Sequence, residues 1–293
     1  MREVRVATRG SALARWQANY VADLLRAADP DLDVELVVVQ TTGDARADVP
    51  LHTIGGQGVF VKEIQQAVLD GRADITVHSA KDLPSSPPPD GLVLAAVPPR
   101  GDARDALVGS RLVDLAPGAT VATGSVRRQA QLAALRPDLV FTDLRGNIDT
   151  RLTKIPDGGA VVVAQAALER LGLADRAADV LGVDVMVPQV GQGALAVECR
   201  ADDDVWRDRL AVVESALDRG FVDLERAFLN ELGGGCDLPV GAHARLDADG
   251  QLVLHSFVAG PGGVWNLSRH GLLGDTAWAA GVAKEAAQAV ALR

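Results

Sequence analysis

The feature that most constrains this fold is an alternation of short β-type runs with longer helical segments across residues 4–172. The β-type runs are rich in β-branched residues, whereas the helical segments carry apolar residues at helical spacing. Strands that alternate with helices pair mainly in parallel, through right-handed crossovers. The predicted strands are 4–8, 34–41, 73–79, 92–97, 119–124, 139–144 and 160–165, and the predicted helices are 11–28, 59–71, 125–136, 147–155 and 166–172.

Two segments marked by proline and glycine, 98–102 and 187–198, interrupt this alternation. A stretch of chain that is bounded by two such segments is typical of a domain inserted into another domain. Beyond residue 202 the pattern changes to helices at 202–216 and 219–233, a hairpin-like pair at 240–247 and 251–260, and a final helix at 276–293. We therefore expect an α/β domain 1 at 1–97 and 194–212, an inserted α/β domain 2 at 98–193, and a small α+β domain 3 at 213–293. Paired α/β domains bind ligands in the cleft between them, near strand carboxyl ends.

Composition excludes several classes of function. The net charge is −10 over 293 residues, which argues against non-specific binding to nucleic acid. No apolar run is long enough to span a membrane, and the start, MREVRVATRG, lacks the pattern of a signal peptide. Two cysteines provide no disulfide framework, and the five histidines have no close metal-ligand spacing. These features predict a soluble cytoplasmic protein without a metal and without nucleic-acid or membrane partners.

Positive charge is concentrated in residues 121–155, which contain six basic residues and three acids. One interpretation is a solvated helix face. The other is a pocket for a small polyanion.

The two cysteines stand in different contexts. Cys199, in VECR, follows apolar residues on a strand-like run and is predicted to be a structural core residue. Cys236 stands in LGGGCDLPVG, where three glycines precede it and a proline follows. A buried structural cysteine usually has apolar neighbours on a regular element, so the flexible surroundings of Cys236 suggest another role.

Seven segments together resemble the porphobilinogen deaminase (hydroxymethylbilane synthase) family, in the right order and over nearly the whole chain. They are ATRGSALARWQA (7–18), GGQGVFVKE (55–63), RADITVHSAKDLP (72–84), GSVRRQAQL (124–132), LRGNIDTRLTK (144–154), VGQGALAVECR (190–200) and GGGCDLPVGAHA (233–244). The resemblance implies three domains, of which the first two are like the lobes of periplasmic binding proteins. It implies an enzyme that condenses four porphobilinogens, with loss of ammonia, into linear hydroxymethylbilane for tetrapyrrole and heme biosynthesis. It also implies a monomer.

The resemblance further implies a dipyrromethane primer, bound covalently to Cys236 through a thioether. By the same match Asp82 is the catalytic residue, which stabilises positive charge on the pyrrole nitrogen and moves protons. The implied cofactor-binding residues are Cys236, Ser79, Lys81, Asp82, Thr123, Ser125, Arg127, Arg128 and Arg145. The implied substrate-binding residues are Arg9, Ser11, Arg145, Arg151, Arg170 and Gln192, since guanidinium groups grip carboxylates through paired hydrogen bonds. The implied mobile loop contains Gly55, Gly56, Gln57, Gly58 and Phe60.

Three positions depart from the family pattern. Gln57 stands where lysine is common, Gly124 where serine is common, and Ala167 where glycine is common. Only the first removes a charge, which is expected to weaken the steering of an anionic substrate.

Two other functions fit part of the sequence. A cytosolic two-lobed anion-binding protein without catalysis would use the same arginines, but it leaves domain 3 and Cys236 unexplained. A thiol-dependent hydrolase would use Cys236 as its nucleophile and would need a nearby histidine base, for which His243 is the nearest candidate in the sequence.

Overall fold

We describe a computed structural model of the chain, which covers residues 2–41, 61–234 and 238–292. The chain divides into two compact units. The first consists of residues 1–101 and 194–219, and the second of residues 102–193 and 220–293. The three-domain boundaries expected from the sequence, and the cleft between the first two domains, stay a prediction.

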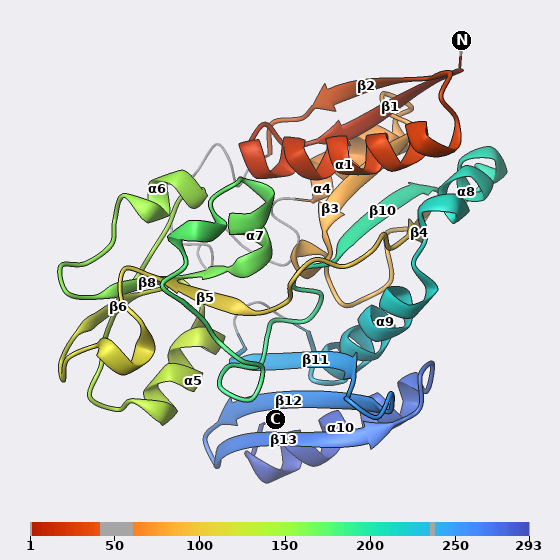
Figure 1. The fold of residues 1–293 in the computed structure, drawn as a ribbon. Helices are drawn as coiled ribbons and strands as arrows, with labels where there is room; N and C mark the ends of the chain where they lie inside the picture. The colour runs from red at the N-terminus through yellow and green to blue at the C-terminus, as the bar shows by residue number, and fades with distance from the viewer. Residues whose placement is uncertain (1, 42–60, 235–237, 293) are drawn as a thin grey trace. The chain divides into compact units, whose positions relative to one another are not determined.

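The first unit is built on a five-stranded sheet with the order β2-β1-β3-β10-β4 (Figure 1). The strands β1, β2 and β3 are parallel, whereas β10 runs antiparallel to both of its neighbours. The antiparallel strand β10 forms after the chain has passed through the second sheet and returned to the first. The strands are β1 (Arg2–Thr8), β2 (Leu32–Val38), β3 (Ile75–Ser79), β4 (Leu92–Ala96) and β10 (Leu195–Arg200).

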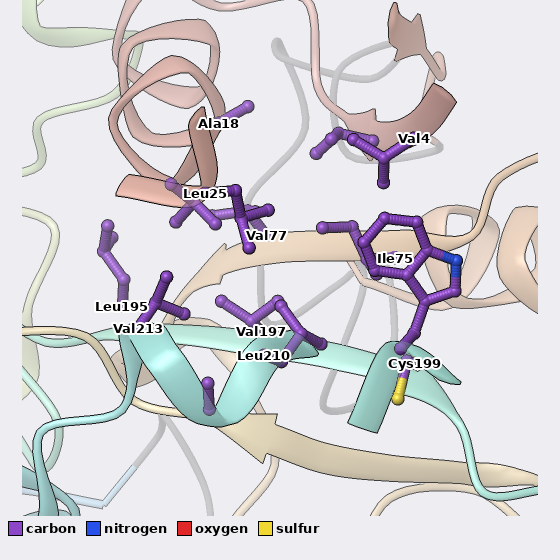
Figure 2. Close-up of a cluster of buried hydrophobic side chains, with 14 of the residues drawn as sticks. Val4, Ala18, Leu25, Ile75, Val77, Leu195, Val197, Cys199, Leu210 and Val213 are labelled. Atoms are coloured by element: carbon purple, nitrogen blue, oxygen red, sulfur yellow. The ribbon is translucent and has the colours of Figure 1, made fainter. Parts of the chain in front are cut away.

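Helices cover both faces of this sheet. On one face α1 (Ala12–Ala28) and α8 (Asp204–Leu210) pack against Val4, Ile75 and Val197, as Figure 2 shows. On the other face lies α4 (Lys62–Leu69). Burial on both faces fits the inner strands β3 and β10, whose residues are nearly all buried, whereas β2 at the edge of the sheet is only partly buried.

Cys199 belongs to the first of these cores, with no exposed surface (Figure 2). Burial raises the pKa of its thiol to about 11. The expectation that Cys199 is a structural residue is confirmed.

The second sheet repeats the topology of the first, with the order β7-β6-β8-β5-β9. Again three adjacent strands are parallel, and the fourth, β5, runs antiparallel to its neighbours. The helices α5 (Val126–Leu135), α6 (Ile148–Leu152) and α7 (Gln165–Arg170) contribute to the two cores on its faces. The strands are β5 (Asp105–Val108), β6 (Thr120–Ala122), β7 (Val140–Thr142), β8 (Ala160–Ala164) and β9 (Asp179–Val180).

The C-terminal part is a three-stranded antiparallel sheet in the order β11-β12-β13. Its strands are β11 (Val240–Leu246), β12 (Leu252–Gly260) and β13 (Gly263–Gly271). The helices α9 (Ala216–Glu231) and α10 (Thr276–Ala289) share one apolar core with it. Together the three sheets confirm the expected fold class of two α/β parts and a small C-terminal α+β part. Within the described residues, we find no helix with the length and apolar character needed to cross a membrane.

Candidate functional site

A cavity in the first unit lies where β1 and β3 end. Its cavity volume is about 30 Å³, and it is partly open to solvent. Because parallel strands end at the same edge of a sheet, the residues that follow β1 and β3 meet there. The lining residues are Arg9, Ala14, Gln17, Val61, Ile64, Val77, His78, Ser79 and Asp82.

Local hydrogen bonds fix the two turns that carry Arg9 and Asp82. Ser11 is the N-cap of α1, and its side chain accepts a hydrogen bond from the Ala14 amide at 3.3 Å. The Thr8 hydroxyl donates to the Ala14 carbonyl at 3.2 Å, so Arg9 is held between a strand end and a helix start. After β3 the chain forms a short 3₁₀ turn, Ala80–Asp82, which places Asp82 in the cavity wall with Ser79.

This cavity therefore combines one carboxylate with one guanidinium in a partly enclosed space. Lys81, on the same 3₁₀ turn, is half-buried but does not line the cavity. In such surroundings a charged group acts on a bound ion far more strongly than it does in water. The arrangement suits a ligand that carries both acidic side chains and a developing positive charge.

A second group of predicted residues meets in the second unit, around the carboxylate of Asp105. Asp105 has no exposed surface, and its two oxygens accept from Arg127 Nη2 at 2.8 Å and from Arg128 Nη2 at 2.7 Å. The Gln192 side-chain amide donates to the same carboxylate at 2.8 Å. Sequence reasoning named both arginines and Gln192 but missed Asp105. The available signal was an acid at the start of an apolar run, DALV.

The charges in this cluster do not balance. Burial raises the pKa of Asp105, but Arg127, Arg128 and the Gln192 amide together overcome that effect and lower the pKa to about 2. One carboxylate thus stays ionised against two buried guanidinium groups, which leaves an excess positive charge. Arg127 Nε is also buried and has no hydrogen-bond partner among the described residues. Both features fit an acidic group bound beside Arg127.

Backbone groups hold these side chains in place. The Val187 carbonyl accepts from Arg127 Nη1 at 2.6 Å and from the Gln131 amide at 3.0 Å. Ser125 is the N-cap of α5, and the Thr123 hydroxyl accepts from the Ser125 amide at 3.2 Å. Thr123 and Ser125 thus lie at the start of the helix that carries both arginines, where backbone amides favour anions.

The structure places the other predicted arginines elsewhere in the second unit. Arg145 lies between β7 and α6, with Nε 3.6 Å from an Asp143 oxygen. Arg151 donates from Nε to the Gly146 carbonyl at 2.8 Å, and Arg170, at the end of α7, donates to the Gly193 carbonyl at 2.6 Å. The predicted contacts of these three side chains with substrate or cofactor stay predictions.

Two predicted features lie outside the described residues. These are Cys236 and the loop residues Gly55, Gly56, Gln57, Gly58 and Phe60.

Fold and site together define the class of protein: an α/β protein whose buried arginines and cavity carboxylate suit an acidic ligand. The comparisons with known proteins identify the family. The model of the family described as "Porphobilinogen deaminase, dipyromethane cofactor binding domain" matches residues 4–208, and the model of the "Porphobilinogen deaminase, C-terminal domain" matches residues 221–291. The chain belongs to the porphobilinogen deaminase family.

Individual relatives agree. The porphobilinogen deaminase of Nitratidesulfovibrio vulgaris is 47% identical over 264 residues, which is 88% of this chain and 83% of the relative. That of Syntrophotalea carbinolica is 48% identical over 261 residues, with 87% and 82% covered.

Among solved structures, the methionine-binding protein MetQ is similar, with a TM-score of 0.45, 15% identity, and 73% of this chain and 90% of that one covered. A periplasmic TRAP solute-binding protein from Desulfovibrio salexigens, solved with orotic acid, has a TM-score of 0.36, 14% identity, and coverages of 77% and 79%. At such low TM-scores neither likeness bears on the ligand or activity of this chain.

Proposed function

We propose that this protein is a hydroxymethylbilane synthase. It condenses four porphobilinogen molecules head to tail, releases ammonia at each step, and yields the linear tetrapyrrole hydroxymethylbilane for porphyrin and heme biosynthesis. The observation that carries the proposal is the family match across residues 4–208 and 221–291, with 47% identity to a protein named porphobilinogen deaminase.

The arginine cluster supports dipyrromethane as the cofactor. The excess positive charge around Asp105 and the unpartnered Arg127 Nε fit the carboxylates of such a group. When bound, the group supplies the pyrrole carbon at which the chain starts to grow. We assign its covalent anchor to Cys236 and its binding to Ser79, Lys81, Asp82, Thr123, Ser125, Arg127, Arg128 and Arg145.

We assign catalysis to Asp82. Its place in the wall of a cavity that also contains Arg9 supports this role, because the carboxylate can face pyrrole N–H groups while the guanidinium holds an acidic side chain. For the substrate carboxylates we assign Arg9, Ser11, Arg145, Arg151, Arg170 and Gln192. We further propose that residues Gly55, Gly56, Gln57, Gly58 and Phe60 form a mobile loop.

The proposal also covers the cellular location, the oligomeric state and the partners of the protein. The protein acts as a cytoplasmic monomer on a small molecule, without nucleic-acid or membrane partners. The net charge of −10 supports this proposal with respect to nucleic acid.

The decisive experiment combines intact-protein mass with turnover. The purified protein is expected to exceed its sequence mass by one dipyrromethane and to convert porphobilinogen into a product that oxidises to coloured uroporphyrin. Cys236→Ser should lose the added mass and the activity, whereas Cys199→Ser, the matched control, should keep both.

The outcomes separate the alternatives. A protein of unmodified mass that binds porphobilinogen without consuming it would be an anion-binding protein. A thiol hydrolase would also show the unmodified mass, but it would need Cys236 for the hydrolysis of an acyl substrate. Asp82→Ala should retain the added mass and the fold but lose turnover, and normal turnover in that variant would remove Asp82 from the mechanism.

A further inference from the structure

A buried histidine in the wall of the cavity has no part in the function assigned so far. His78 lies on β3, four residues before Asp82, and only 3% of its side chain is exposed. It lines the same cavity as Asp82 and Arg9. A histidine enclosed in this way needs partners for its ring nitrogens, because an unpaired buried polar group is costly.

Both polar partners of the His78 ring lie at the same ring nitrogen, Nε2. Nε2 lies 3.2 Å from an oxygen of Glu198 on β10 and 3.0 Å from the Thr76 hydroxyl. A carboxylate can only accept, so the Glu198 contact favours the tautomer with the proton on Nε2. The other nitrogen, Nδ1, is left to exchange a proton with the cavity.

Glu198 itself is 1% exposed. The Gln65 side-chain amide, on α4, donates to its two oxygens at 3.1 and 2.9 Å. Among the described residues, no lysine or arginine forms an ion pair with this carboxylate. A carboxylate buried behind an imidazole holds the ring in one orientation.

We propose that His78 carries a proton during the condensation and that Glu198 is its positioning residue. This proposal rests on the proposed function. When the C–N bond of the aminomethyl group of porphobilinogen breaks, its electron pair stays on nitrogen, and that nitrogen takes the Nδ1 proton of His78 and leaves as ammonia. The pair of His78 and Glu198 then has one net negative charge, opposite the pyrrole cation.

The second half of the cycle restores the proton. The methylene carbon of the cation bonds to the free α-carbon of an acceptor pyrrole, and the hydrogen on that α-carbon leaves as a proton to His78 Nδ1. The sum is one C–N bond broken, one C–C bond formed and one proton moved from carbon to the departing nitrogen, which leaves as ammonia. The pair ends each addition as it began, as repeated chain growth requires.

Among the described residues, Glu198 on β10 contacts the His78 ring, Asp82 and Arg9 line the same cavity, and α4 contributes the neutral Gln65. Loss of the Glu198 charge removes the group that favours the protonated ring. Activity should therefore fall at a lower pH in Glu198→Gln than in the wild type.

The test uses the full, cofactor-loaded protein. His78→Asn should lower kcat by about 100-fold or more, with a small change in KM, because a proton carrier contributes that much to rate. Glu198→Gln preserves the volume, so it reports on the pair even if His78→Asn does not fold. It should lower kcat and move the alkaline limb of the pH–rate profile to lower pH. His255 is a buried histidine of the C-terminal sheet. The variant His255→Asn is therefore the matched control and should behave as the wild type.

Intact mass and the melting midpoint establish that each variant is loaded and folded. A loaded His78→Asn protein with the wild-type kcat would overturn the proposal, as would Glu198→Gln with an unchanged rate and pH profile. The proposed function fails in a different way, through a wild-type protein that has no added mass and does not consume porphobilinogen.

Discussion

At the scale of single residues, the Asp105 carboxylate is fully buried and forms ion pairs with two guanidinium groups. We expect Asp105→Asn to lower the free energy of unfolding by about 3 kcal/mol, since removal of one partner leaves buried charge uncompensated. Urea unfolding at neutral pH measures the change. Asp102→Asn is the control, because Asp102 pairs with the more exposed Arg104 and should cost about 1 kcal/mol or less.

The same carboxylate gives the molecule an acid-sensitive component of stability. Its pKa falls from an ordinary 3.8 to about 2 on folding. A carboxyl group whose pKa is lower in the folded state than in the unfolded state stabilises the fold at any pH above the unfolded-state pKa. That stabilisation, about 2 kcal/mol, is lost as the pH falls from about 4 to 2. Urea unfolding at several pH values should show this loss in the wild type and not in Asp105→Asn. An equal acid dependence in the two proteins would contradict the assignment.

Cys199 should be chemically inert in the folded protein. Its side chain is buried, and its pKa is raised to about 11, so at pH 8 only about one thiol in a thousand is ionised. Iodoacetamide at pH 8 should therefore leave Cys199 unmodified until denaturant is added. Peptide mapping measures the labelling, and rapid labelling of the native protein would contradict the buried position.

At the scale of elements, β11 packs closely on the segment that holds Arg127. A Cβ at Gly241 would lie 2.7 Å from the Val187 carbonyl oxygen and 3.0 Å from that of Pro188. The Val187 carbonyl is the one that accepts from Arg127, so a shift here also disturbs the arginine cluster. We expect Gly241→Ala to lower the free energy of unfolding by about 1–3 kcal/mol.

The chain offers a matched control for this glycine. Gly281, inside α10, has nothing within 4 Å of an added Cβ. Gly281→Ala should therefore raise the free energy of unfolding, by up to about 1 kcal/mol, because alanine favours helix over glycine. Urea titrations of the two variants compare them directly, and equal effects would contradict the close contact at Gly241.

At the scale of the whole molecule, cofactor and stability are expected to be linked. Without an acidic ligand, the excess positive charge around Asp105 is uncompensated. On the proposed function, Cys236→Ser is expected to melt about 5 °C below the loaded protein, which corresponds to about 2 kcal/mol for a chain of this size. Thermal melts of loaded wild type and Cys236→Ser measure the difference, and identical midpoints would show that the cofactor does not stabilise the fold.

Much of this molecule could be predicted from local sequence. The helix predicted over 11–28 with Ser11 as its N-cap is observed as Ala12–Ala28 with that cap, and Gly71 has the positive φ expected of a helix end. The strands β5, β9 and β13 were not predicted, and the segment of β10 was expected only as a crossing that ends in a strand-like run at Cys199. β5 is four residues long, too short to display a period, and β13 is largely exposed and carries no alternating apolar pattern.

The residues of the candidate site also fall into those that local sequence predicts and those that it does not. Arg127, Arg128 and Gln192 could be named from their motifs, because those motifs are continuous in sequence. Asp105 and Glu198 could not, because each acts through partners distant in the chain: Glu198 meets Gln65 and His78 at separations of 133 and 120 residues. Sequence by itself thus determined the helices, their caps and most strands, since periodicity and capping depend on near neighbours. Only the tertiary structure decided which strand runs reversed and which charges are buried together, because burial and pairing are set by contacts between distant segments.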